Sequence, residues 1–198
     1  RLVTYDPLTG AVNLNFSISP ITSGTYYKNG YWLSVQNLGN NTNPNYRLLN
    51  WTIDVTPGAF MISSATWQPN IVSNISWPWS GLGTTWDMEA GIAVTTSPVT
   101  PPAVGAWYGT SVQAASLITG QQLWNKTYEE TMYSGASTVA DHGKVAIITM
   151  NGYWLGLNLN DGSVAWKSET LDYPWDSPGF GSYGVASAYG LFYRFAYS

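Results

Sequence analysis

The sequence contains no cysteine, one histidine and few charged residues. The absence of cysteine excludes disulfides, thiolate metal sites and a cysteine nucleophile. The single histidine, His142, excludes a metal site built from several imidazoles. Only 9% of the 198 residues are charged, whereas about 25% is usual for soluble domains. Something other than charge therefore has to keep the surface soluble.

Basic residues are scarce and scattered. Seven Lys and Arg stand against eleven Asp and Glu, and the net charge is -4. Because nucleic-acid binding requires clustered positive charge opposite the phosphates, no nucleic-acid partner is expected. Long apolar runs are absent too, so no transmembrane segment is predicted. The first residues lack the pattern of an export signal, which is expected of a mature chain or a fragment.

Polar amides are abundant where charge is not. Asn-x-Ser/Thr sequons begin at Asn15, Asn40, Asn50, Asn74 and Asn125. Such sequons accept N-linked glycans in exported proteins. They predict an extracellular or cell-surface glycoprotein, and Asn40 is the favoured site because its loop has Gly and Pro and no strand pattern. The alternative is that these asparagines only serve polar turns and strands.

One segment has the clearest internal pattern. Three β-rich runs, 143–150, 153–159 and 163–167, are separated by Asn151-Gly152 and by 160–162, which reads Asn-Asp-Gly. Asn-Gly and Asp-Gly pairs tolerate the positive φ angles of tight hairpin turns. The segment is therefore predicted to be an antiparallel meander.

Pieces of this meander recur along the chain. Residues 29–33 copy 151–155, residues 116–124 copy 158–166, and residues 5–14 copy 158–166 again, with Leu14 in the Trp position. Repetition at this level is typical of solenoids and propellers.

The repeated element resembles the PQQ-like, or quinoprotein-type, β-propeller repeat. It has a strand, a Thr-Gly or Asp-Gly turn at Gly10, Gly120 or Gly162, and a Trp after three further residues. The resemblance implies an all-β propeller of four-stranded antiparallel blades, with the Trp packed between neighbouring blades. By the same resemblance this role is assigned to Trp51, Trp124 and Trp166.

About four blades' worth of sequence is predicted, in one propeller domain or propeller segment. Its expected parts are a half-blade at 1–17, a blade at 24–55, an irregular excursion at 56–87, blades at 88–128 and 135–170, and a half-blade at 182–198. The excursion is separated because Pro69 and Pro78 interrupt any regular ladder, with strands expected only near 60–65 and 71–75.

The two terminal half-blades are complementary. Aligning Gly190 with Gly143 makes the end of the chain the first half of a blade, and aligning Gly10 with Gly162 makes its beginning the second half. Unpaired strand edges promote association. Three explanations stay open: ring closure within the chain, completion of a neighbour's blade, and excision from a longer propeller.

No catalytic centre is predicted. His142 is expected in a turn, and Asp87 with Glu89, on one strand face, is the best candidate acidic pair. Quinone-dependent dehydrogenases of the resembled class hold quinone and calcium with a vicinal cystine, a Trp and a Glu/Asn/Asp set, which this sequence lacks. No cofactor and no metal are therefore expected, and a dehydrogenase is the third alternative.

Aromatic residues make up 15% of the chain. The aromatic residues have two explanations, packing between blades, which is favoured, and a platform for carbohydrate or a partner. The candidates for the platform are Tyr31, Trp32, Tyr153 and Trp154, which follow predicted turns. The expected function is a non-enzymatic extracellular structural or interaction glycoprotein, as a cell-surface or filament-forming subunit with identical partners. A carbohydrate- or ligand-binding propeller module is the alternative.

Overall fold

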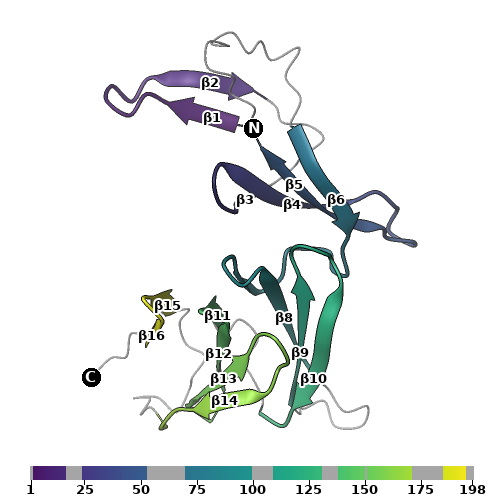
Figure 1. The fold of residues 1–198 in the computed structure, drawn as a ribbon, viewed down its shortest axis with the longest axis vertical. Coiled ribbons are helices and arrows are strands. Elements are labelled where there is room, and N and C mark those ends of the chain that lie inside the picture. Colours follow the sequence, from purple (N-terminus) through teal and green to yellow (C-terminus); the bar gives the residue numbers. More distant parts are fainter. Residues whose placement is uncertain are drawn as a thin grey trace. The chain divides into compact units, whose positions relative to one another are not determined.

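The structure is a computed structural model, and every regular element in its described part is a β-strand (Figure 1). The described residues are 2–16, 24–52, 70–99, 109–130, 138–149, 151–170 and 185–194. The chain divides into two compact units, Arg1–Gly81 and Leu82–Ser198, which are described separately.

The first unit holds a hairpin and one blade. The N-terminal hairpin pairs β1 (Leu2–Tyr5) with β2 (Val12–Phe16). The first blade is a four-stranded antiparallel meander in chain order. Its strands are β3 (Thr25–Tyr26), β4 (Tyr31–Asn37), β5 (Tyr46–Thr52) and β6 (Asn70–Ser76).

The second unit holds two blades and a hairpin. The second blade contains β7 (Thr85–Asp87), β8 (Ile92–Pro98), β9 (Thr110–Ser116) and β10 (Gln122–Tyr128). The third blade contains β11 (Thr138–Asp141), β12 (Lys144–Ile148), β13 (Trp154–Asn158) and β14 (Val164–Lys167). The C-terminal hairpin pairs β15 (Val185–Ala188) with β16 (Leu191–Arg194). Each blade is an antiparallel meander whose strands pair in chain order.

The turn between the first and second strands has the same backbone conformation in the first and third blades and in the C-terminal hairpin. Its two residues have φ angles of 53° and 80° at Asn29-Gly30, 49° and 71° at His142-Gly143, and 55° and 73° at Tyr189-Gly190. Positive φ at both central positions matches the twist of a two-residue hairpin. The C-terminal hairpin therefore has the geometry of strands one and two of a blade.

This geometry corrects one sequence alignment. Asn29-Gly30 joins the first two strands of its blade, whereas Asn151-Gly152 lies between the second and third strands of its own. The match of 29–33 to 151–155 is therefore wrong as a strand assignment. Asn-Gly suits any tight hairpin, so the dipeptide alone does not identify which strands it connects.

A β-bulge recurs in every pairing of a third with a fourth strand. The register shifts once in β5/β6, β9/β10 and β13/β14, and it shifts at the equivalent place in β1/β2. The extra residues are Asn13, Val72, Leu123 and Ala165. A bulge strengthens strand twist and shifts one strand against the other. Because β1 and β2 contain this bulge, the N-terminal hairpin has the same register as the third and fourth strands of a blade.

Blade boundaries differ from the expected ones at the excursion 56–87. Asn70–Ser76 forms β6, the fourth strand of the first blade, and Thr85–Asp87 forms β7, the first strand of the second. The expected strand near 71–75 therefore belongs to a blade, and the one near 60–65 lies outside the described residues. Pro78 lies after the end of β6 and does not interrupt it, which is where proline is tolerated; Pro69 lies outside the described residues.

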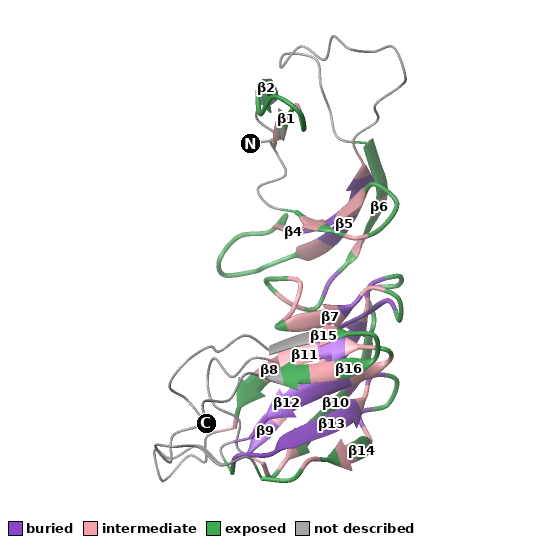
Figure 2. Ribbon diagram, turned by 90° about the vertical axis from the view of Figure 1, so that its left-hand side faces the viewer, coloured by how far each residue is buried: buried purple, intermediate pink, exposed green. Residues whose placement is uncertain are grey.

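The best-packed core of the described residues joins the second and third blades. Seven of its members are at 1% exposure or less: Val94, Val112, Ala114, Val145, Ile147, Leu157 and Leu159. Figure 2 shows this burial along β12 and β13, while β6 is largely exposed. Apolar side chains from both faces of these strands are excluded from water, which explains the dense Val and Ile content.

Candidate functional site

The junction between the second and third blades is built around Trp124. This side chain is 8% exposed, and its Nε1 donates to the carbonyl oxygen of Leu159 at 2.6 Å. A Cβ added to Gly162 would lie 2.7 Å from Trp124 Cε3, so only glycine fits beneath the ring. Tyr128 Oη donates to the carbonyl of Gly162, and burial raises the pKa of Tyr128 to about 12. Trp124 and Tyr128 of the second blade thus bind the β13–β14 turn of the third blade through hydrogen bonds and packing.

Asp87 forms a second contact across the same junction. Its Oδ1 accepts hydrogen bonds from the backbone N–H groups of Glu89 and Ala90, both at 2.9 Å. Its Oδ2 accepts from the backbone N–H of Gly143 at 2.8 Å. Glu89 lies in the turn after β7, so the expected pairing of Asp87 and Glu89 on one strand face is wrong. The carboxylate of Asp87 instead links two blades.

Trp166 lies at the equivalent position of the third blade but is only partly buried. Its ring covers Gly156, where a Cβ would overlap it, and lies 5.9 Å from the ring of Phe192 on β16. Trp154 is 6.4 Å from the same Phe192 ring. Trp166 thus packs between its own blade and the C-terminal hairpin.

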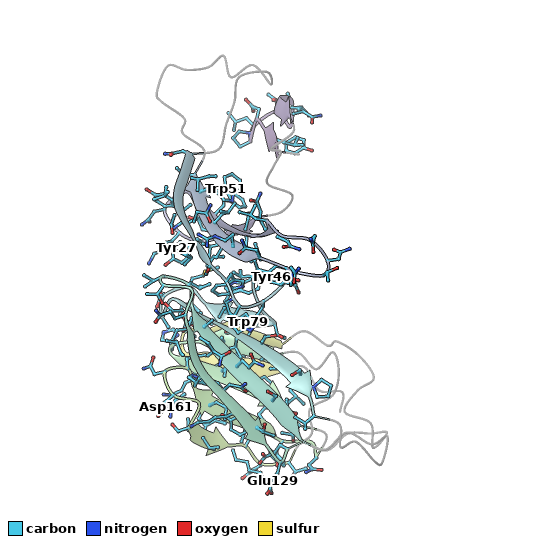
Figure 3. The ribbon with its side chains drawn as sticks, turned by 90° about the vertical axis from the view of Figure 1, so that its right-hand side faces the viewer. Tyr27, Tyr46, Trp51, Trp79, Glu129 and Asp161 are labelled. Carbon is cyan, nitrogen blue, oxygen red and sulfur yellow. The ribbon has the colours of Figure 1, made fainter. Side chains whose placement is uncertain are left out.

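Trp51 does not share this position, which corrects the sequence assignment. It lies on β5, a third strand, and pairs with Ile71 ahead of the bulge. The residue after the bulge in the first blade is Ser73. Trp51, labelled in Figure 3, is 1% exposed. Its Nε1 donates to Ser34 Oγ at 2.9 Å, and its ring stacks on that of Trp32 with 5.9 Å between the ring centroids. Its described contacts stabilise its own blade.

The four aromatic residues expected at an exposed rim divide into two pairs. Tyr153 and Trp154 are buried, at 7% and 5% exposure, and Lys167 Nζ lies 3.7 Å above the Tyr153 ring. They form part of the core, so the alternative of an exposed platform is wrong for this pair. Tyr31 and Trp32 are half-buried on β4.

Four of the five sequon asparagines are exposed. Asn40 lies in the β4–β5 loop, and its Oδ1 accepts from the backbone N–H groups of Thr42 and Asn43 at 2.9 and 2.7 Å. Asn15, Asn74 and Asn125 lie exposed on β2, β6 and β10. Asn50 differs, because its strand β5 is paired on both sides and its Oδ1 is buried without a hydrogen-bond partner.

The glycines of the repeated turn also have assigned places. Gly10, Gly120 and Gly162 follow the tight turn between third and fourth strands, with φ angles of 71°, 73° and 68°. A positive φ in this range favours glycine. The Cβ position of Gly10 has no atom within 4 Å among the described residues, in contrast to Gly162 beneath Trp124.

Ionisable groups are sparse over the described part of the chain. There, no group of three or more His, Cys, Asp or Glu side chains gathers in a way that could hold a metal ion. His142 is exposed in the β11–β12 turn, with Nδ1 2.8 Å from Asp141 Oδ1. This hydrogen bond and the negative charge of Asp141 raise the pKa of His142.

Comparisons with known proteins concern the fold. No family model matches the sequence, and no curated protein matches it significantly. Among solved structures, the chain is similar to the crystal structure of BamB from Moraxella catarrhalis, with 16% identity and a TM-score of 0.39. The match covers 74% of this chain and 34% of that one, so the chain spans about a third of the length of that protein.

The described residues define the class of the protein. They form an all-β fold of the β-propeller type, built from antiparallel four-stranded blades. No described helix is long and apolar enough to cross a membrane.

Proposed function

We propose that this chain is a non-enzymatic extracellular glycoprotein built from PQQ-like propeller blades, with a structural or interaction role at the cell surface or in a filament. Its subunits join by strand complementation, in which the N-terminal hairpin of one copy completes the blade begun by the C-terminal hairpin of another. The observation that carries this proposal is the complementary register of the two hairpins.

The register supports a specific pairing. In the third blade, Ala146 on β12 pairs with Gly156 on β13. Tyr193 is the counterpart of Ala146, because both lie at the same distance from the first turn of their blades. Thr4 is the counterpart of Gly156, because each pairs with the residue that follows the bulge, Leu14 for Thr4 and Trp166 for Gly156. Thr4 of one copy is therefore expected opposite Tyr193 of another.

The junction chemistry supports the same pairing. Trp166 is the counterpart of Trp124, while Gly10 and Pro7 are the counterparts of Gly162 and Leu159. Trp166 Nε1 donates no hydrogen bond within the described residues, and the space over Gly10 is open there. On the pattern of Trp124, the indole would cover Gly10 and donate to the carbonyl of Pro7. Such burial of a large aromatic side chain contributes several kcal/mol to an interface.

Because the chain lacks cysteine, engineered disulfides test the pairing directly. We expect Thr4→Cys with Tyr193→Cys to give a ladder of disulfide-linked oligomers under mild oxidation, seen on non-reducing gels. The matched control is Val3→Cys with Tyr193→Cys. Neighbouring residues on a strand face opposite sides of the sheet, so the control is expected to stay unlinked.

Two results would contradict this proposal. A crosslink confined to a compact monomer would mean that the hairpins close one chain on itself, which removes the filament role. Equal crosslinking of both cysteine pairs, or none, would mean that the two hairpins do not pair in this register.

Carbohydrate binding is a second candidate function, favoured by one aromatic pair. Tyr26 is 54% exposed and meets Trp32 edge-on at 5.7 Å. An exposed aromatic ring that a second ring holds in place, as Trp32 does for Tyr26, is suited to stack on a sugar. Glycan-array binding that disappears in Tyr26→Ala, with unchanged unfolding, would support this function over a purely structural one.

A further inference from the structure

Three of the sequons occupy one structural position. Asn15, Asn74 and Asn125 each lie on the strand after the bulge, directly after the residue that follows it. Their partners on the adjacent strand are Val3, Leu49 and Gln113. In the third blade the same position is Lys167, opposite Leu155. The sequons therefore follow the period of the blades.

The side chains at this position are held in similar ways in two blades. Arg47 Nε donates to Asn74 Oδ1 at 2.8 Å, and Ser111 Oγ donates to Asn125 Oδ1 at 3.2 Å. Arg47 and Ser111 are themselves counterparts, since each pairs with the hydroxyl residue of the sequon. The Nδ2 atoms, to which sugar is attached, donate no hydrogen bond within the described residues.

The strands that carry these asparagines are exposed apolar edges. β2 ends its hairpin, and β6 and β10 end their four-stranded sheets, as β14 does in the third blade. Large apolar side chains at and just before the bulge are exposed by 44 to 56% on these strands and on β2: Val12, Ile71, Val72, Leu123 and Val164. Edge strands with exposed apolar side chains pair with other chains unless something blocks them.

Charge protects few of these edges, because only 9% of the chain is charged. Lysine is one known protection of an edge strand. β14 carries it at Lys167, the position that is a sequon elsewhere, and β10 carries Lys126 directly after its sequon asparagine. A large hydrophilic glycan at the same place would serve the same purpose on β2, β6 and β10.

We propose that Asn15, Asn74 and Asn125 carry N-linked glycans that shield the fourth-strand edges, while Asn50 carries none. The exclusion of Asn50 follows from its position between two paired strands and from its buried Oδ1. This inference rests on the proposed extracellular function, because N-glycans are added only along the export route.

Site-by-site glycopeptide mass spectrometry tests the inference on the chain secreted from a eukaryotic host. We expect glycan on Asn15, Asn74 and Asn125, and none on Asn50. Modification of Asn40 alone would overturn this inference and leave the extracellular function standing. An unmodified chain would overturn both, and occupancy of Asn50 equal to that of the other sites would overturn the positional rule.

A second measurement tests the shielding role. Thr127→Gln removes a sequon with a polar side chain but keeps Asn125 and its bond from Ser111, while Thr127→Ser keeps the sequon. We expect Thr127→Gln to raise the soluble aggregate several-fold in light scattering, whereas Thr127→Ser and Asn40→Gln behave like the parent. Equal aggregation of Thr127→Gln and Thr127→Ser would overturn the shielding role.

Discussion

The first blade and the two that follow it share a strand order and a bulge, but they fill the position after the bulge differently. In the second blade Trp124 stands there, opposite Ala114, and in the third blade Trp166 stands opposite Gly156. A small residue on the third strand leaves room for an indole on the fourth. That indole then contacts the neighbouring blade or hairpin.

In the first blade the pair is Ser73 opposite Asn50. Here the Trp is not on the fourth strand. It is Trp51, which follows Asn50 on the third strand and stacks on Trp32 of the second strand. A Trp on the fourth strand after the bulge therefore contacts the next blade or hairpin, whereas a Trp on the third strand before the bulge contacts its own blade. Three pairs of variants test this difference.

Trp124→Ala is expected to have the largest effect. It removes a buried indole that joins two blades, together with its bond to Leu159, and large-to-small changes of this kind cost about 3 to 5 kcal/mol. The free energy of unfolding from urea titration measures it. Trp166→Ala is the matched variant and is expected to cost less in the unassembled chain, because Trp166 is only partly buried there. Equal losses would mean that Trp166 is fully covered in solution, as it would be in the proposed assembly.

Gly162→Ala is expected to have the second largest effect. The φ of Gly162 is 68°, and a new Cβ would overlap the Trp124 ring. Left-handed backbone costs alanine about 1 to 2 kcal/mol, and overpacking adds about 1 to 3 kcal/mol. Gly143→Ala is the control, because its φ is 71° but its Cβ position is open within the described residues. The difference between the two variants in urea unfolding isolates the contact with Trp124.

Asn50→Ala is expected to stabilise the first blade. It removes a buried oxygen without a partner, whose burial costs about 1 to 3 kcal/mol, and it introduces the residue found at Ala114 in the second blade. We expect a gain of about 1 kcal/mol in the free energy of unfolding. Asn74→Ala, which breaks a satisfied hydrogen bond with Arg47, is expected to lower it instead. A loss in both variants would mean that Asn50 has a partner in solution.

The smallest expected effect is the pH dependence at the β11–β12 turn. Because Asp141 raises the pKa of His142 above 6.5, the protonated pair stabilises the folded state fully below that pH. This contribution is lost as pH rises through the folded pKa. The effect on stability is small, since the pair is exposed. Nuclear magnetic resonance titration is expected to show the raised pKa, and Asp141→Asn to return it toward 6.5.

The sequence predicted the antiparallel meander of the third blade because its signals are local. Turn dipeptides such as His142-Gly143, Asn151-Gly152 and 160–162 depend on backbone conformations that a few neighbouring residues impose. The placement of Trp124 in the repeat is local too, because the same number of residues separates it from Gly120 as separates Trp166 from Gly162. Scarce charge and absent cysteine likewise limited the possible chemistry without any structure.

Tertiary structure decided which strand each piece became. Trp51 follows a β pattern like any other, but only the pairing of β5 with both β4 and β6 places it on a third strand. Pro69 and Pro78 marked an interruption in the sequence, yet the sheet uses the residues between them as β6. The bulge that aligns Asn15, Asn74 and Asn125 is a register between distant residues. Local sequence does not encode such pairing, because it depends on the burial gained by the whole sheet.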